Sequence, residues 1–185
     1  MKTNTTLAAA ALIVLVVGGW WLFSRVAGGE PIDLISTDRF ATVKKQPVPD
    51  IFSLIEATLN GDTRRAIAVQ PAPGSRLTWK IRVPDDAWLD LAVGLQPEAW
   101  TQEGNGVLFR AGVSDGRTYE ELFTLHLNPF ANAGERRWVP VMVDLSAYGG
   151  EEVDVIINTN ASPPTQAEDH RNDFALWATP RVITR

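Results

Sequence analysis

The chain has 185 residues, of which 45% are hydrophobic and 21% charged, so it is long enough to fold around a substantial core. Its net charge of −5 argues against nucleic-acid binding, which needs a concentrated basic patch, and against adhesion to anionic lipid headgroups. The sequence contains no cysteine and two histidines. This excludes disulfides, thiolate zinc sites, thiol redox chemistry and a histidine-rich metal site.

The N-terminal segment predicts a helix that spans a membrane. Residues 3–24 include no charged side chain and, at about 1.5 Å per residue, reach roughly 33 Å, enough to cross the hydrocarbon core. Trp20 and Trp21 lie at one end, where indole rings favour the headgroup region. A signal peptide cleaved at 26–28 is the alternative, but the apolar region of a signal peptide is usually shorter. We therefore expect a retained anchor over residues 1–26.

The same segment predicts an orientation and a partner. A short N-terminal tail before a signal-like helix usually stays in the cytoplasm, which places the C-terminal domain in the periplasm, on a bacterial inner membrane. Gly18 and Gly19 are small enough to let another helix approach closely. We interpret Gly18, Gly19, Trp20 and Trp21 as contacts to other membrane protein subunits within the lipid bilayer.

Residues 27–50 show no sustained hydrophobic period and contain two glycines and three prolines, which predicts an extended linker. The next stretch, 51–60, fits either a helix that begins after Asp50 or a strand, and we favour the strand. Pro140, inside a strand-like run, indicates an edge strand or a bulge.

Beyond residue 60 the sequence consists of short alternating runs separated by turn residues. In RLTWKIRV, residues 76–83, every second residue is hydrophobic, which is the period of a half-buried strand. The runs at 89–95, 107–113 and 153–157 have the same period. We predict an all-β fold, an antiparallel β-sandwich over residues 51–185.

Two stretches resemble a known family of sandwiches. RRWVPVMVDLSAYGGEEVDVIINTN (136–160) and NDFALWATPRV (172–182) resemble extracellular jelly-roll domains of the galactose-binding-like and carbohydrate-binding-module-like kind. The resemblance implies a jelly-roll fold, which serves many functions. The layout, one membrane helix followed by one extrinsic domain, is similar to that of accessory subunits of bacterial reaction-centre–light-harvesting complexes.

The sequence offers little that could be catalytic. It has no nucleophile elbow, and the adjacent pairs Glu120-Glu121 and Glu151-Glu152 would point to opposite faces of a strand, which is poor geometry for paired-carboxylate hydrolysis. We expect no enzymatic activity and no organic cofactor. Asp169 and Asp173 provide hard oxygen ligands that suit a structural calcium ion, with a solvated acidic loop as the alternative.

Exposed aromatic side chains could bind either a protein or a sugar. Trp100, on a predicted loop, is the strongest candidate, because tryptophan is favoured at interface hot spots. We predict a non-catalytic accessory subunit that braces a larger membrane complex, with a photosynthetic reaction-centre–light-harvesting complex as the leading host. The alternative is a membrane-tethered carbohydrate-binding module that binds a glycan. The other aromatic residues available for that role are Trp88, Trp138, Trp177, Tyr119 and Tyr148.

Overall fold

The computed structural model describes residues 29–70, 75–161, 165, 167 and 169–185. Its strands are β1 (Ile32–Asp33), β2 (Lys44–Gln46), β3 (Phe52–Leu59), β4 (Asp62–Val69), β5 (Ser75–Arg82), β6 (Ala87–Leu95), β7 (Val107–Ser114), β8 (Tyr119–Leu127), β9 (Val139–Asp144), β10 (Glu152–Asn160) and β11 (Ala175–Thr184). The helical elements are the short helix α2 (Thr37–Thr42) and the 3₁₀ turns η1 (Pro49–Ile51), η2 (Pro97–Trp100), η3 (Ala133–Glu135) and η4 (Ser146–Tyr148). The prediction of an all-β class is confirmed.

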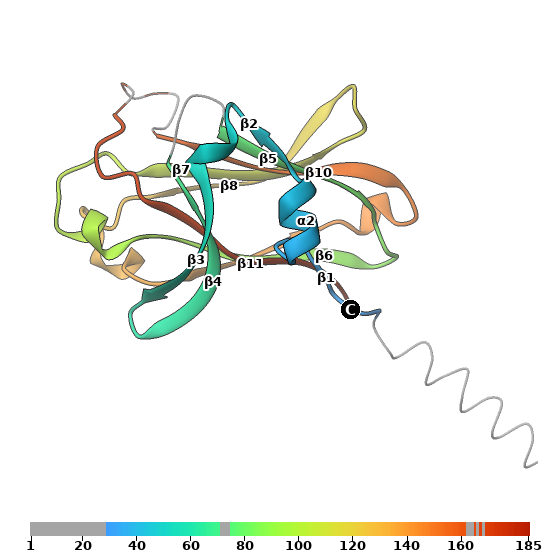
Figure 1. The fold of residues 1–185 in the computed structure, drawn as a ribbon, viewed down its shortest axis with the longest axis horizontal. Helices are drawn as coiled ribbons and strands as arrows, with labels where there is room; N and C mark the ends of the chain where they lie inside the picture. The colour runs from blue at the N-terminus through green and yellow to red at the C-terminus, as the bar shows by residue number, and fades with distance from the viewer. Residues whose placement is uncertain (1–28, 71–74, 162–164, 166, 168) are drawn as a thin grey trace, which may run out of the picture. The chain divides into compact units, whose positions relative to one another are not determined.

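The strands form two antiparallel sheets that pack face to face as a sandwich (Figure 1). The six-stranded sheet has the order β3-β4-β11-β6-β9, with β1 also paired to β11. The five-stranded sheet has the order β2-β5-β10-β7-β8. Pro140 lies in β9, an edge strand of the six-stranded sheet. The open side of an edge strand has no neighbouring strand, so the missing N–H of proline costs no hydrogen bond between strands there.

Much of the core between the sheets consists of residues that the alternating pattern predicted to be buried. On β5, Leu77, Trp79 and Ile81 are each at most 4% exposed. At the centre, the rings of Phe109 and Trp177 meet edge to face with centroids 5.1 Å apart. The two sheets therefore share one continuous hydrophobic core.

The ambiguous stretch at 51–60 forms a strand. β3 and β4 make a hairpin in which Leu59 lies opposite Asp62. The two residues between them, Asn60 and Gly61, have φ values of 49° and 80°. Positive φ at both central residues is what a tight type I′ hairpin turn requires, and Asn-Gly satisfies it at low cost. The helical alternative is wrong because this turn commits both flanking segments to the sheet.

The prediction of an extended linker over residues 27–50 is wrong from Pro31 onward. Residues Pro31–Arg185 form one compact unit, so the domain begins well before residue 51. Leu34 and Ile35 are 0% and 2% exposed, and the Leu34 N–H donates to the Pro180 carbonyl at 3.0 Å. The segment contributes one short strand to each of the two sheets, and strands this short show no hydrophobic period from which the sequence could predict them.

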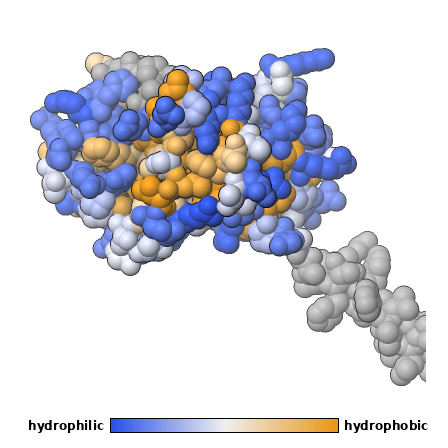
Figure 2. Space-filling view, viewed as in Figure 1, coloured by the Kyte–Doolittle hydropathy of each residue, from blue (hydrophilic) through white to orange (hydrophobic). Residues whose placement is uncertain are grey.

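The segment between those two strands covers an edge of the sandwich. The chain leaves β1 in the six-stranded sheet, forms α2 and joins the five-stranded sheet as β2 (Figure 1). Figure 2 shows hydrophobic residues gathered on this side of the molecule, in the area between α2 and the β3–β4 hairpin. Phe40 of α2 and Leu54 of β3 are partly buried and pack against the core.

The predicted anchor over residues 1–26, with Gly18, Gly19, Trp20 and Trp21, lies outside the described residues. Within the part of the chain that the structure describes, no helix has the length and hydrophobicity needed to cross a membrane. The anchor and its proposed contacts therefore stay predictions from the sequence.

Candidate functional site

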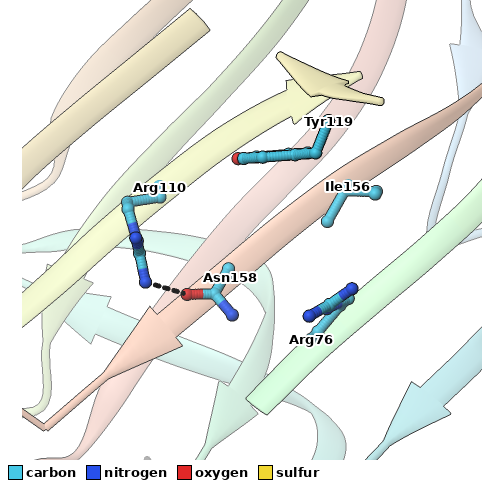
Figure 3. A pocket seen from close by; sticks show the side chains of 5 residues that line it. All are labelled: Arg76, Arg110, Tyr119, Ile156 and Asn158. Carbon is cyan, nitrogen blue, oxygen red and sulfur yellow. Dashed lines mark hydrogen bonds between the residues drawn. The ribbon is translucent and has the colours of Figure 1, made fainter. Parts of the chain in front are cut away.

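The outer face of the five-stranded sheet carries a cavity of about 210 Å³. Its lining comes from four neighbouring strands, and Figure 3 shows Asn158 between Arg110 and Arg76, with Tyr119 across the cavity from them. A cavity of this size suits one small ring rather than a large ligand. The lining residues are Arg76, Arg110, Tyr119, Ile156 and Asn158.

Strand register brings these side chains together from distant parts of the sequence. Asn158 of β10 lies opposite Arg76 of β5 on one side and opposite Arg110 of β7 on the other. Because directly opposed residues point to the same face, all three side chains reach the outer surface of the sheet. Ile156, two residues before Asn158 on the same strand, adds a hydrophobic floor that is 6% exposed.

A β-bulge positions Tyr119. The pairing of β7 with β8 shifts register between Ala111 and Gly112, as expected where a bulge redirects the side chains that follow. The Tyr119 ring then packs over Gly112, where an added Cβ would lie only 2.9 Å from two ring atoms. Tyr119 is 43% exposed, so its ring is held in place while much of it remains open to a ligand.

Hydrogen bonds fix the polar side of the cavity. Arg110 donates from Nη2 to the side-chain oxygens of Asn158 at 3.2 Å and Asn160 at 2.6 Å, and its Nη1 lies 3.6 Å from a Glu121 carboxylate oxygen. Asn158 in turn donates to the Ser75 carbonyl at 3.0 Å. The Nε of Arg110 is buried and has no hydrogen-bond partner within the described residues. Arg110 and Asn158 are therefore oriented before any ligand arrives.

The remaining two polar groups are more open. Arg76 is exposed, and no ion pair or hydrogen bond of its side chain is found within the described ranges. Burial raises the pKa of the Tyr119 hydroxyl above its ordinary value, and the charge of Glu121 raises it further. The hydroxyl therefore stays protonated at neutral pH and can donate a hydrogen bond.

The structure does not support Trp100 as the open binding aromatic. Trp100 is partly buried at the end of η2, packs against a small cluster on the six-stranded sheet and donates from Nε1 to the Leu95 carbonyl at 3.0 Å. The indole is therefore already engaged in contacts within the protein, because the 3₁₀ turn folds it back onto the sheet.

Of the other aromatic residues named from the sequence, only Tyr119 lines the cavity, and the rest contact other parts of the protein. Trp138 and Trp177 are 4% and 0% exposed, and each donates its indole N–H to a protein oxygen. Trp88 lies under the Arg185 guanidinium at 4.6 Å. Tyr148 donates to a Glu120 carboxylate oxygen at 2.7 Å.

Asp169 and Asp173, predicted as calcium ligands, have opposite environments. Hydrogen bonds from Arg171, the shortest 2.8 Å, hold the pKa of Asp169 at about 2. Asp173 is 5% exposed, and neither of its carboxylate oxygens has a hydrogen-bond partner in the described part of the chain. Burial, with a smaller contribution from the Asp169 charge, raises the pKa of Asp173 to about 8. The described residues contain no cluster of three acidic or histidine side chains that could hold a metal, so calcium stays a prediction.

Sequence reasoning missed Arg76, Arg110 and Asn158 as parts of one site. The alternating pattern placed Arg76 on the outer face of its strand, but it did not say which strands would flank it. The available signal was a polar residue at an outward position in each of three strands. Such a signal is uninformative until the strand order is known.

Comparisons with known proteins define the fold but not a family. No family model matches the sequence. An uncharacterized protein of Archaeoglobus fulgidus is 36% identical over 104 residues, a match that covers 56% of this chain and 25% of that protein. The chain therefore spans about a quarter of the length of this relative.

Solved structures with a similar fold include structures that contain CBM51, CBM61 and CBM22 domains. The Clostridium perfringens ZmpB catalytic domain with its two CBM51 domains matches with a TM-score of 0.50 at 14% identity, over 85% of this chain and 14% of that one. TmCBM61 in complex with β-1,4-galactotriose matches with a TM-score of 0.50 at 9% identity, over 77% and 87%. The CBM22-2 xylan-binding domain of Paenibacillus barcinonensis Xyn10C matches with a TM-score of 0.50 at 8% identity, over 84% and 98%. These likenesses confirm the β-sandwich fold.

Proposed function

We propose that this chain is a non-catalytic glycan-binding protein whose binding site is the cavity on the outer face of the five-stranded sheet. The observation that carries the proposal is the Tyr119 ring held beside fixed amide and guanidinium groups. A sugar ring has an apolar C–H face that packs on an aromatic ring, and an edge of hydroxyl groups that needs hydrogen-bond partners. The cavity offers both, and its volume suits one sugar unit.

The arrangement also has the rigidity that sugar recognition needs. Arg110 and Asn158 are held by hydrogen bonds within the sheet, so a ligand does not have to pay the entropy of ordering them. The fold comparisons favour this alternative over the accessory-subunit prediction, which no comparison supports. The anchor predicted over residues 1–26 would tether such a domain to the membrane of a bacterial cell, with the glycan on the exported side.

Electrophoresis of the purified full-length chain through gels that contain soluble polysaccharides, neutral and acidic, tests the proposal. We expect the migration of the wild-type chain to be retarded by at least one polysaccharide. Tyr119→Ala should weaken that retardation roughly tenfold, which corresponds to about 1.4 kcal/mol. Phe130→Ala is the matched control, because Phe130 is also 43% exposed and does not line the cavity.

Two results would contradict the proposal. One is a wild-type chain that is retarded by none of the polysaccharides while its circular dichroism shows a folded β protein. The other is a Tyr119→Ala variant that binds as well as Phe130→Ala.

A further inference from the structure

The charges around the cavity are not balanced, and Arg76 is the source of the imbalance. Elsewhere on this face, basic residues of β5 lie opposite acidic residues of β10: Lys80 opposite Asp154, and Arg82 opposite Glu152. Arg76 on the same strand lies opposite the neutral Asn158 on one side and the neutral Gln46 of β2 on the other. The pairing of opposite charges along β5 thus stops at the cavity.

The second arginine of the cavity does not add a free positive charge. Arg110 lies 3.6 Å from Glu121, and its Nη2 is occupied by Asn158 and Asn160. Arg76, in contrast, is exposed and has no carboxylate partner within the described residues. A guanidinium group left open beside an aromatic ring and two fixed polar groups is complementary to a planar anion attached to a small ring.

We propose that the cavity binds an acidic sugar, a uronic acid unit of a polysaccharide, with its carboxylate on the Arg76 guanidinium and its ring against Tyr119. The inference rests on the proposed glycan-binding function and names its ligand class. A uronate carboxylate is planar and accepts two parallel N–H bonds from a guanidinium fork, which a neutral sugar hydroxyl cannot do. Arg76 therefore selects for acidic sugars, while Tyr119 and Asn158 contribute to binding of any sugar.

The experiment compares two polymers that differ only at the carboxyl carbon. Polygalacturonate is the acidic probe, and the same polymer with its carboxyl groups reduced to primary alcohols is the neutral one. Two further acidic polysaccharides, alginate and glucuronoxylan, are each compared with their carboxyl-reduced form and extend the comparison to other ring configurations. The affinity of the full-length chain for each is measured by titration calorimetry at low and at moderate salt.

We expect the wild-type chain to bind at least one of the acidic polymers ten times or more tightly than its reduced form. Arg76→Gln should abolish this difference while the affinity for the reduced polymer stays within about twofold. Arg76→Lys keeps the charge but not the fork, and it should retain part of the preference. Arg82→Gln is the matched control, since it removes the same charge from the same face and strand, away from the cavity, and should leave the preference intact.

The outcomes separate this inference from the proposal on which it rests. Equal or stronger binding of neutral polymers by the wild-type chain would overturn the acidic-sugar inference and leave glycan binding standing. An equal loss of preference in Arg76→Gln and Arg82→Gln would also overturn it, because the effect would then be general attraction of a polyanion. A folded wild-type chain that binds no polymer of either kind would overturn both.

Discussion

Raising the pH from about 4 to about 8 should destabilise this domain through one carboxyl group, that of Asp173. Asp173 lies just before β11, is 5% exposed and makes no side-chain hydrogen bond within the described residues. Burial of an unpaired carboxylate is unfavourable, so the folded protein keeps the group protonated and the pKa is raised from 3.8 to about 8.

The sign and size of the effect follow from that shift. Between the unfolded pKa of 3.8 and the folded pKa of about 8, the folded state holds a proton that the unfolded state has lost. The free energy that this proton contributes to folding is fully present below 3.8 and is lost as the pH rises to about 8. At about 1.4 kcal/mol per pKa unit the upper limit is roughly 6 kcal/mol. Entry of water around the carboxylate reduces this cost, and we expect a loss of at least about 1 kcal/mol.

Urea denaturation followed by tryptophan fluorescence, at several pH values between about 4 and 8 and in the presence of a chelator, measures the effect. Asp173→Asn keeps the shape of the side chain and removes its charge, so it should flatten the pH dependence and stabilise the domain at the upper end. Asp38→Asn, which changes an exposed aspartate of α2, is the control. If wild type and Asp173→Asn lose the same stability over this interval, Asp173 is not the group responsible.

Four further changes test other parts of the structure. Leu34→Ala should lower the free energy of unfolding by about 2–5 kcal/mol in urea denaturation, because Leu34 is 0% exposed. An unchanged midpoint would indicate that the segment is a linker after all. Trp177→Phe removes the 2.8 Å hydrogen bond to Thr159 and should cost about 2–4 kcal/mol by the same assay; a loss below about 1 kcal/mol would contradict this. Gly112→Ala should displace the Tyr119 ring and the Glu120 carbonyl, weaken glycan retardation and lower the melting temperature, and normal binding would refute that placement. If calcium binds at Asp173, adding calcium at neutral pH should raise the melting temperature of the wild type and not of Asp173→Asn, and no rise in either would exclude the site.

The predicted strands were recognisable because each has a local cause. Alternation at 76–83 places one face of a strand in the core whatever its neighbours are, and the Asn60-Gly61 pair sets a tight hairpin turn by backbone geometry alone. The segment at 31–50 has no such local cause. Leu34 and Ile35 are buried only because other strands surround them, so their short apolar pair was indistinguishable from a linker.

The candidate site depended on information that no single segment contains. Trp100 was favoured from the sequence because it lies on a predicted loop, and only the packing of η2 shows that its indole N–H already donates to the Leu95 carbonyl. Asn158 is a site residue because β10 lies between β5 and β7 in the sheet. This strand order brings Asn158 next to Arg110, which lies 48 positions earlier in the sequence.

The sequence by itself therefore determined the class of fold and the buried faces of its main strands, because the hydrophobic period acts over a few residues. The tertiary structure alone decided where the domain begins, which aromatic ring is open and that Arg76 lines the cavity without a carboxylate partner among the described residues. Those properties depend on strand order and register, which are set by contacts between segments that lie far apart in the sequence.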